Sequence, residues 1–144
     1  MGHHIESVHL EENDPKFNMP YTPAIKVRSG TTVYVAGVTA VPVYHSHPHV
    51  AEELGDVPED PAQQAELAVE NLRRVLRAAW GDLTDIVALN VYIKDMDPNQ
   101  DAVTPVIGRA MGTHRPTSTL VEVVRLAASP KLILEITATA VVPD

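Results

Sequence analysis

Three histidines in one short segment have the clearest capacity for chemistry in this chain. His45, His47 and His49 alternate with other residues in the segment 44–49. In an extended chain this spacing places the three imidazoles on one side, and three histidines can hold a catalytic zinc ion. Because alternating histidines in an irregular loop are no specific metal signature, we expect no metal here. Recognition of a substrate or an anion is one interpretation, and a solvated or capping role is another.

The carboxylate of Glu135 is the second group suited to chemistry. Apolar and polar residues alternate through 131–141, which predicts a strand with Glu135 on its more polar face. A carboxyl group confined at such a place is suited to proton transfer near neutral pH. A structural ion pair with a basic group across a subunit interface is the alternative.

The elements that position these residues follow from the periodicity of apolar side chains. Asp60 and Pro61 are a typical helix start, and Gly81 is the expected end. Pro105 is expected to kink a second helix or to mark its start, and Gly37 suggests a bulge or a close backbone approach. We expect strands near 5–10, 24–28, 31–36, 86–93, 118–124 and 131–141, helices over 61–80 and 99–111, and a hairpin turn at 29–30.

This order of elements predicts one α+β domain over residues 1–144. Two helices would cover one face of a mixed sheet in a two-layer sandwich. The other face carries Ile133 beside Glu135, Thr137 and Thr139, a mixture too apolar for solvent and too polar for a core. A subunit interface would explain it.

Composition limits the classes of function. The formal net charge is −8, which gives no support to nucleic-acid binding. There are no cysteines, no apolar run long enough to cross a membrane and no signal-peptide pattern. We expect a cytoplasmic protein without membrane association.

Several motifs in order resemble the Rid family, the reactive intermediate deaminases also called YjgF and carrying an older endoribonuclease L-PSP label. The resemblance covers roughly residues 20–142 and rests on the segments 20–25, 33–37, 70–72, 83–87, 91–96, 115–125 and 134–136. It implies a chorismate mutase-like (YjgF) fold and a homotrimer with a central β-barrel. It also implies a site in each cleft between neighbouring subunits, with no metal or organic cofactor.

The deaminases of that family hydrolyse reactive enamines and imines, such as 2-aminoacrylate, to keto acids and ammonia. By position, the resemblance makes Tyr21 the pocket tyrosine and Glu135 the water-activating glutamate. Ser118 stands where the deaminating branch has the arginine that grips the substrate carboxylate. Ser118 and Thr119 offer hydroxyls without charge. Either the substrate lacks that carboxylate or another cation, such as Arg115, supplies the grip.

His114, beside Arg115, is a further candidate for binding the substrate. The residues leave two functions open. The first is a Rid-type hydrolase for an enamine, an imine or a related C–N substrate. The second is a non-catalytic protein that binds a small metabolite or acts as a regulator through the same cleft. The acidic charge argues against a nuclease.

Overall fold

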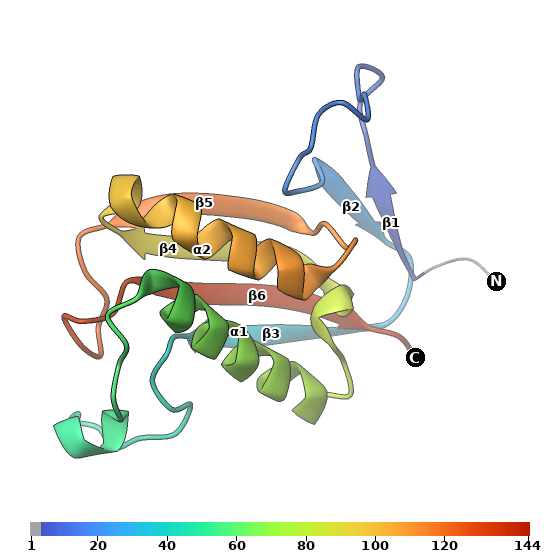
Figure 1. Ribbon diagram of the computed structural model, residues 1–144. Helices are drawn as coiled ribbons and strands as arrows, with labels where there is room; N and C mark the ends of the chain where they lie inside the picture. Colours follow the sequence, from blue (N-terminus) through green and yellow to red (C-terminus); the bar gives the residue numbers. More distant parts are fainter. Residues whose placement is uncertain (1–3) are drawn as a thin grey trace.

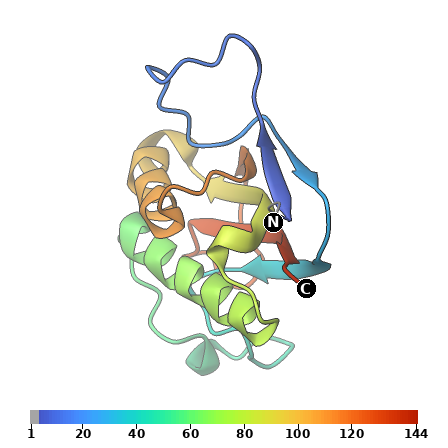
Figure 2. The ribbon, with the colours of Figure 1, turned by 90° about the vertical axis from the view of Figure 1, so that its right-hand side faces the viewer.

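Two helices lie on one face of a four-stranded mixed sheet in the computed structural model, which describes residues 4–144 (Figures 1 and 2). Residues 1–3, where we expect no signal peptide, lie outside the described residues. The predicted element order and the two-layer α+β class are confirmed. The elements are β1 (Ile5–Val8), β2 (Ala24–Val27), β3 (Thr31–Val38), α1 (Pro61–Ala78), β4 (Ile86–Lys94), α2 (Met96–Met111), β5 (Thr117–Val123) and β6 (Leu134–Val142), with short 3-10 turns at Ala51–Leu54 and Leu83–Asp85.

The strand order of the main sheet is β3-β6-β4-β5. β6 is antiparallel to both of its neighbours, and β4 is parallel to β5. Leu134 and Ile136 of β6 are buried under the helices, whereas Glu135 lies half-buried on the opposite face, as the alternation predicts. β3 and β5 are the two edges of this sheet.

The predicted hairpin between β2 and β3 is wrong. β2 pairs with β1 in a separate two-stranded sheet, and β3 pairs with β6. Gly30 has a φ of 110° and lies so close to β6 that a Cβ there would be 2.7 Å from the Val142 carbonyl oxygen. The 29–30 segment therefore carries the chain from one sheet to the other, where only glycine fits.

The helix boundaries agree with the sequence only in part. Asp60 caps α1 as predicted, with its side chain accepting from the Ala62 N–H at 3.1 Å. The helix ends at Ala78, before the expected Gly81, and Trp80 takes the left-handed conformation that a glycine often takes at a helix end. α2 starts at Met96 and continues through Pro105, which therefore does not mark its start.

Gln64 is a buried polar residue that ties α1 to the segment before β6. Its amide nitrogen donates to the carbonyls of Pro58 and Lys131 at 2.8 Å, and its oxygen accepts from the Ile133 N–H at 2.8 Å. We expect Gln64→Leu to lower the free energy of unfolding by at least about 2 kcal/mol, since it leaves buried backbone groups unpaired. Chemical denaturation checks this, and Gln63→Leu at the exposed neighbouring position is the matched control. Equal effects of the two variants would contradict the prediction.

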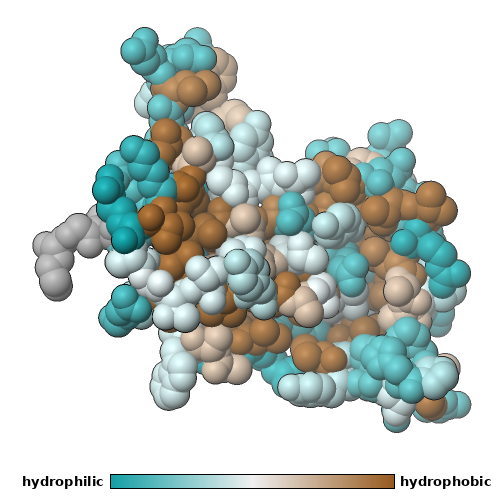
Figure 3. Space-filling view, turned by 180° about the vertical axis from the view of Figure 1, so that it is seen from behind, coloured by the Kyte–Doolittle hydropathy of each residue, from teal (hydrophilic) through white to brown (hydrophobic). Residues whose placement is uncertain are grey.

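The face of the main sheet away from the helices presents polar and apolar side chains together (Figure 3). Tyr34 of β3 is 83% exposed and Val121 of β5 is 40% exposed on a single chain. This is the surface that the sequence assigns to a subunit interface. Within residues 4–144, no helix is long and apolar enough to cross a membrane.

Candidate functional site

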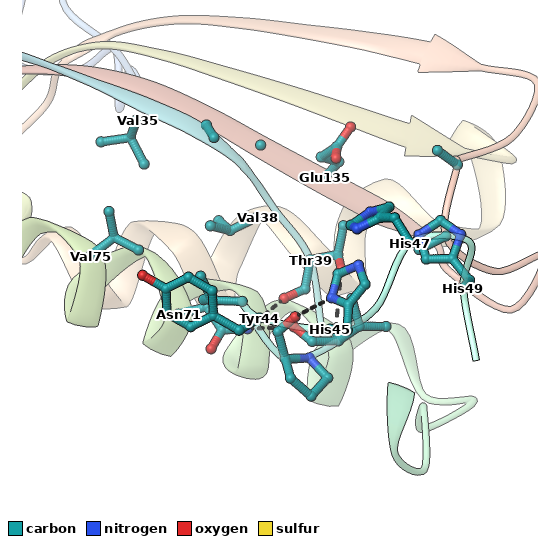
Figure 4. Close-up of a pocket in the computed structure, with 17 residues that line it drawn as sticks. Val35, Val38, Thr39, Tyr44, His45, His47, His49, Asn71, Val75 and Glu135 are labelled. Carbon is teal, nitrogen blue, oxygen red and sulfur yellow. Dashed lines mark hydrogen bonds between the residues drawn. The ribbon is translucent and has the colours of Figure 1, made fainter. Parts of the chain in front are cut away.

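A pocket of about 580 Å³ lies beside the β3 edge of the sheet, between β3, β6, α1 and the loop that follows β3. We call it the histidine pocket. His45, His47 and His49 line it together with Tyr44 and Glu135. Figure 4 shows the three imidazoles gathered beside one another, while Glu135 projects from the β6 wall. The volume of the histidine pocket lies in the range of small-molecule sites.

Glu135 lies against the backbone of β3. The strand bulges between Val35 and Val38, where two residues face one residue of β6. A Cβ built on Gly37 in this bulge would lie 2.7 Å from Glu135 Oε1. Among residues 4–144, no hydrogen bond or ion pair engages the Glu135 carboxylate. The predicted bulge and close approach at Gly37 are thus confirmed, and the carboxylate has lone pairs available in the pocket.

The loop that carries the histidines is fixed at its start and again at Ser46, between the first two histidines. The buried Asn71 amide of α1 donates to the Thr39 and Val41 carbonyls at 2.9 Å each. Glu53 accepts from the Ser46 backbone N–H at 2.7 Å and from the Ser46 hydroxyl at 2.8 Å. The backbone N–H bond, followed by the hydroxyl bond, holds the pKa of the Glu53 carboxyl below its ordinary value.

A second pocket, of about 300 Å³, lies at the other edge of the sheet, between β5 and α2. We call it the tyrosine pocket. Tyr21, Ser118 and Arg115 line it with apolar neighbours such as Leu89 and Leu120. Of the residues that the sequence proposes for binding, Ser118 lines this pocket, whereas Thr119 is exposed and lines neither pocket.

Arg115 and His114 are placed differently. One guanidinium nitrogen of Arg115 donates to the carbonyls of Gly112 and His114, at 2.7 and 3.0 Å. The ring of His114 contacts the Ile86 carbonyl through Nε2 at 2.7 Å, and His114 lines neither pocket. Because its ring nitrogen is bonded to the first residue of β4, His114 helps to connect the end of α2 to the sheet.

The candidate residues thus fall into two groups at opposite edges of one sheet. Glu135 and the three histidines lie in the histidine pocket, and Tyr21, Ser118 and Arg115 in the tyrosine pocket. Sequence reasoning did not single out Tyr44 or Asn71 for a role in the site. Asn71 could have been noticed as a polar residue beside the apolar stripe of α1. In the structure it is only 8% exposed.

Comparison with known proteins identifies the family. The Endoribonuclease L-PSP family profile matches residues 11–142. The chain belongs to this family, the Rid (YjgF) family. A RutC family protein of Pyrococcus horikoshii is 33% identical, with 94% of this chain and 98% of the relative covered. The 2-iminobutanoate/2-iminopropanoate deaminase of Escherichia coli K12 is 30% identical, with 86% of this chain and 90% of the relative covered.

Solved structures of Rid proteins share the fold. The conserved Rid family protein YyfB of Yersinia pestis, whose function is unknown, superposes with a TM-score of 0.79. It is 26% identical, and 97% of this chain and 100% of that chain are covered. The helix-covered sheet that carries both pockets is therefore the fold of the Rid family.

Proposed function

We propose that this Rid protein hydrolyses a reactive enamine, imine or related C–N substrate, with Glu135 activating the attacking water. The observation that carries the proposal is the Glu135 carboxylate, half-buried in a pocket and without a protein partner among residues 4–144. A carboxylate so placed can accept a proton from water as water attacks the imine carbon. The deaminase activity of the Escherichia coli relative supports this reaction class.

We further propose that the complete site forms between two chains of a homotrimer with a central β-barrel. The two pockets lie at opposite edges of the sheet, β3 and β5, so one chain does not bring them together. In a closed cyclic assembly each interface joins two different surfaces of neighbouring chains. The β3 edge of one chain would then meet the β5 edge of the next, and Glu135 would face the tyrosine pocket of its neighbour.

The tyrosine pocket would receive the rest of the substrate. Ser118 offers it a hydroxyl, and one nitrogen of Arg115 is bonded to two carbonyls. A bidentate contact between a guanidinium and a carboxylate is among the strong polar interactions in proteins. We therefore expect a weaker grip on an α-carboxylate than in the deaminating branch, and a preference for imines bound through their side chains.

The test is hydrolysis by the unaltered protein. An amino-acid oxidase generates a panel of imines in situ, with 2-aminoacrylate as a further substrate, and ammonia and the carbonyl product are measured. Release faster than in samples without the protein supports the proposal. Saturable binding of panel members without accelerated release would instead favour a non-catalytic binding protein.

The variant Gly37→Ala tests whether hydrolysis depends on the position of the Glu135 carboxylate. The added methyl group would lie 2.7 Å from Glu135 Oε1, so the flexible end of Glu135 must move. We expect roughly 100-fold slower hydrolysis from this displacement, with the thermal midpoint changed little. Paired activity and unfolding measurements check this. Wild-type rates in Gly37→Ala would contradict the prediction.

A further inference from the structure

The rings of the three histidines of the histidine pocket lie close to one another. Their ring centroids are 4.8 Å apart for His45 and His47, 5.2 Å for His45 and His49, and 4.8 Å for His47 and His49. One ring nitrogen from each lies within 4.8 Å of the others. The sequence spacing alone, in an irregular loop, did not establish this convergence.

The ring nitrogens are available as ligands. His45 Nδ1 is 2.8 Å from the Pro42 carbonyl oxygen, so the hydrogen lies on Nδ1 and the Nε2 lone pair is left free. A metal-binding histidine typically donates its other N–H to such a carbonyl, which fixes its tautomer. Among residues 4–144, the rings of His47 and His49 have no hydrogen-bond or ion-pair partner.

The backbone beneath the rings is held in place. Both Glu53 bonds reach Ser46, between the first two histidines, and the Asn71 amide fixes the start of the loop. The ligand residues therefore project from an anchored loop and not from a free one. An anchored loop lowers the entropy lost when three side chains are brought to one ion.

We propose that His45, His47 and His49 bind one divalent transition-metal ion of the zinc type. Imidazole suits Zn²⁺, Cu²⁺ and Ni²⁺. Tetrahedral zinc with nitrogen ligands at 2.0–2.1 Å needs nitrogen atoms about 3.4 Å apart, so the ring nitrogens must approach one another by up to about 1.4 Å from the observed 4.8 Å. His47 and His49 are exposed, so they can make this movement without disturbing the core.

Three protein ligands leave a coordination position for water or for a donor atom of a small ligand. That position would lie in the pocket whose β6 wall carries Glu135. The inference goes beyond the proposed hydrolysis and does not rest on it, because metal binding is measured without turnover. It also departs from the metal-free chemistry that the family resemblance implies.

The experiment is titration of the full chain, freed of metal by chelation, with Zn²⁺ in a calorimeter and with Co²⁺ in a spectrophotometer. We expect one Zn²⁺ per chain and the intense visible absorption of four- or five-coordinate Co²⁺. His47→Ala is expected to weaken binding by more than about 100-fold, since losing even a hydrogen-bond partner of a ligand costs up to that much.

Two matched controls exclude other histidines. His9→Ala removes an exposed histidine outside the cluster, and the double variant His3→Ala, His4→Ala removes those of the first residues. Both are expected to leave the affinity and the Co²⁺ spectrum unchanged. The proposal is overturned if no saturable binding is seen, if Co²⁺ keeps only its weak six-coordinate spectrum, or if His47→Ala binds as the wild type does.

Discussion

We expect Glu135→Gln to lose most of the hydrolytic activity while leaving the assembly intact. Glutamine keeps the size of the side chain, but it cannot accept the proton that water loses. General base catalysis contributes about 10²–10⁴-fold, and we expect a fall in kcat of that size. Steady-state release of ammonia and carbonyl product by the purified variant measures it. The glutamine side chain fills the same space beside Gly37 as the glutamate does, so the pocket keeps its shape.

Glu66→Gln is the matched control, because Glu66 is exposed on α1 and lines neither pocket. Its rate should equal that of the wild type. A Glu135→Gln rate within a few-fold of the wild type would contradict the role of Glu135. If sedimentation showed that Glu135→Gln dissociates the oligomer, the structural ion pair across the interface would be the better explanation.

The second large effect is expected from Ser118→Arg. The new guanidinium would enter the tyrosine pocket and bind a substrate carboxylate through two parallel hydrogen bonds. Removing one partner of a buried, hydrogen-bonded charge pair costs about 2–5 kcal/mol. That corresponds to a rise of roughly 30- to several-thousand-fold in kcat/KM for 2-aminoacrylate.

The control is Ser118→Met, which adds comparable length without charge. It should give no gain on the same substrate, and neither variant should gain on imines without a carboxylate. Equal gains in Ser118→Arg and Ser118→Met would mean that the pocket responds to bulk and not to charge. No gain in either would contradict the position assigned to Ser118 in the site.

Most of the fold could be predicted because the periodicity of the apolar residues matches the faces that the structure buries. The alternation through β6 and the apolar stripe of α1 each specify one buried face, and the structure buries those faces. The hairpin failed because strand pairing depends on partners distant in the chain: β3 pairs with β6, whose Ile136 lies opposite Val38. The early start of α2 also depends on a distant residue, since Glu122 accepts from the Met96 N–H at 2.8 Å.

The candidate site was predictable in its residue types but not in its arrangement. Sequence placed Glu135 on the open face of its strand, but nothing local shows that Gly37 lies against its carboxylate. The separation of Glu135 from Tyr21 and Ser118 follows from the strand order, which puts β6 beside β3 and leaves β5 at the far edge. Sequence also proposed His114 for substrate binding because it lies next to Arg115, but it could not show that the ring nitrogen is bonded to the Ile86 carbonyl.

The most direct test is activity in mixed oligomers of two inactive variants, Glu135→Gln and Ser118→Trp, the latter filling the tyrosine pocket of about 300 Å³. Each variant alone should be inactive. When the two are coexpressed in equal amounts, a site built from neighbouring chains can take an intact Glu135 from one and an intact tyrosine pocket from the other. Random assembly then restores about a quarter of the wild-type activity. Mixed oligomers that stay as inactive as the separate variants would contradict a site shared between chains.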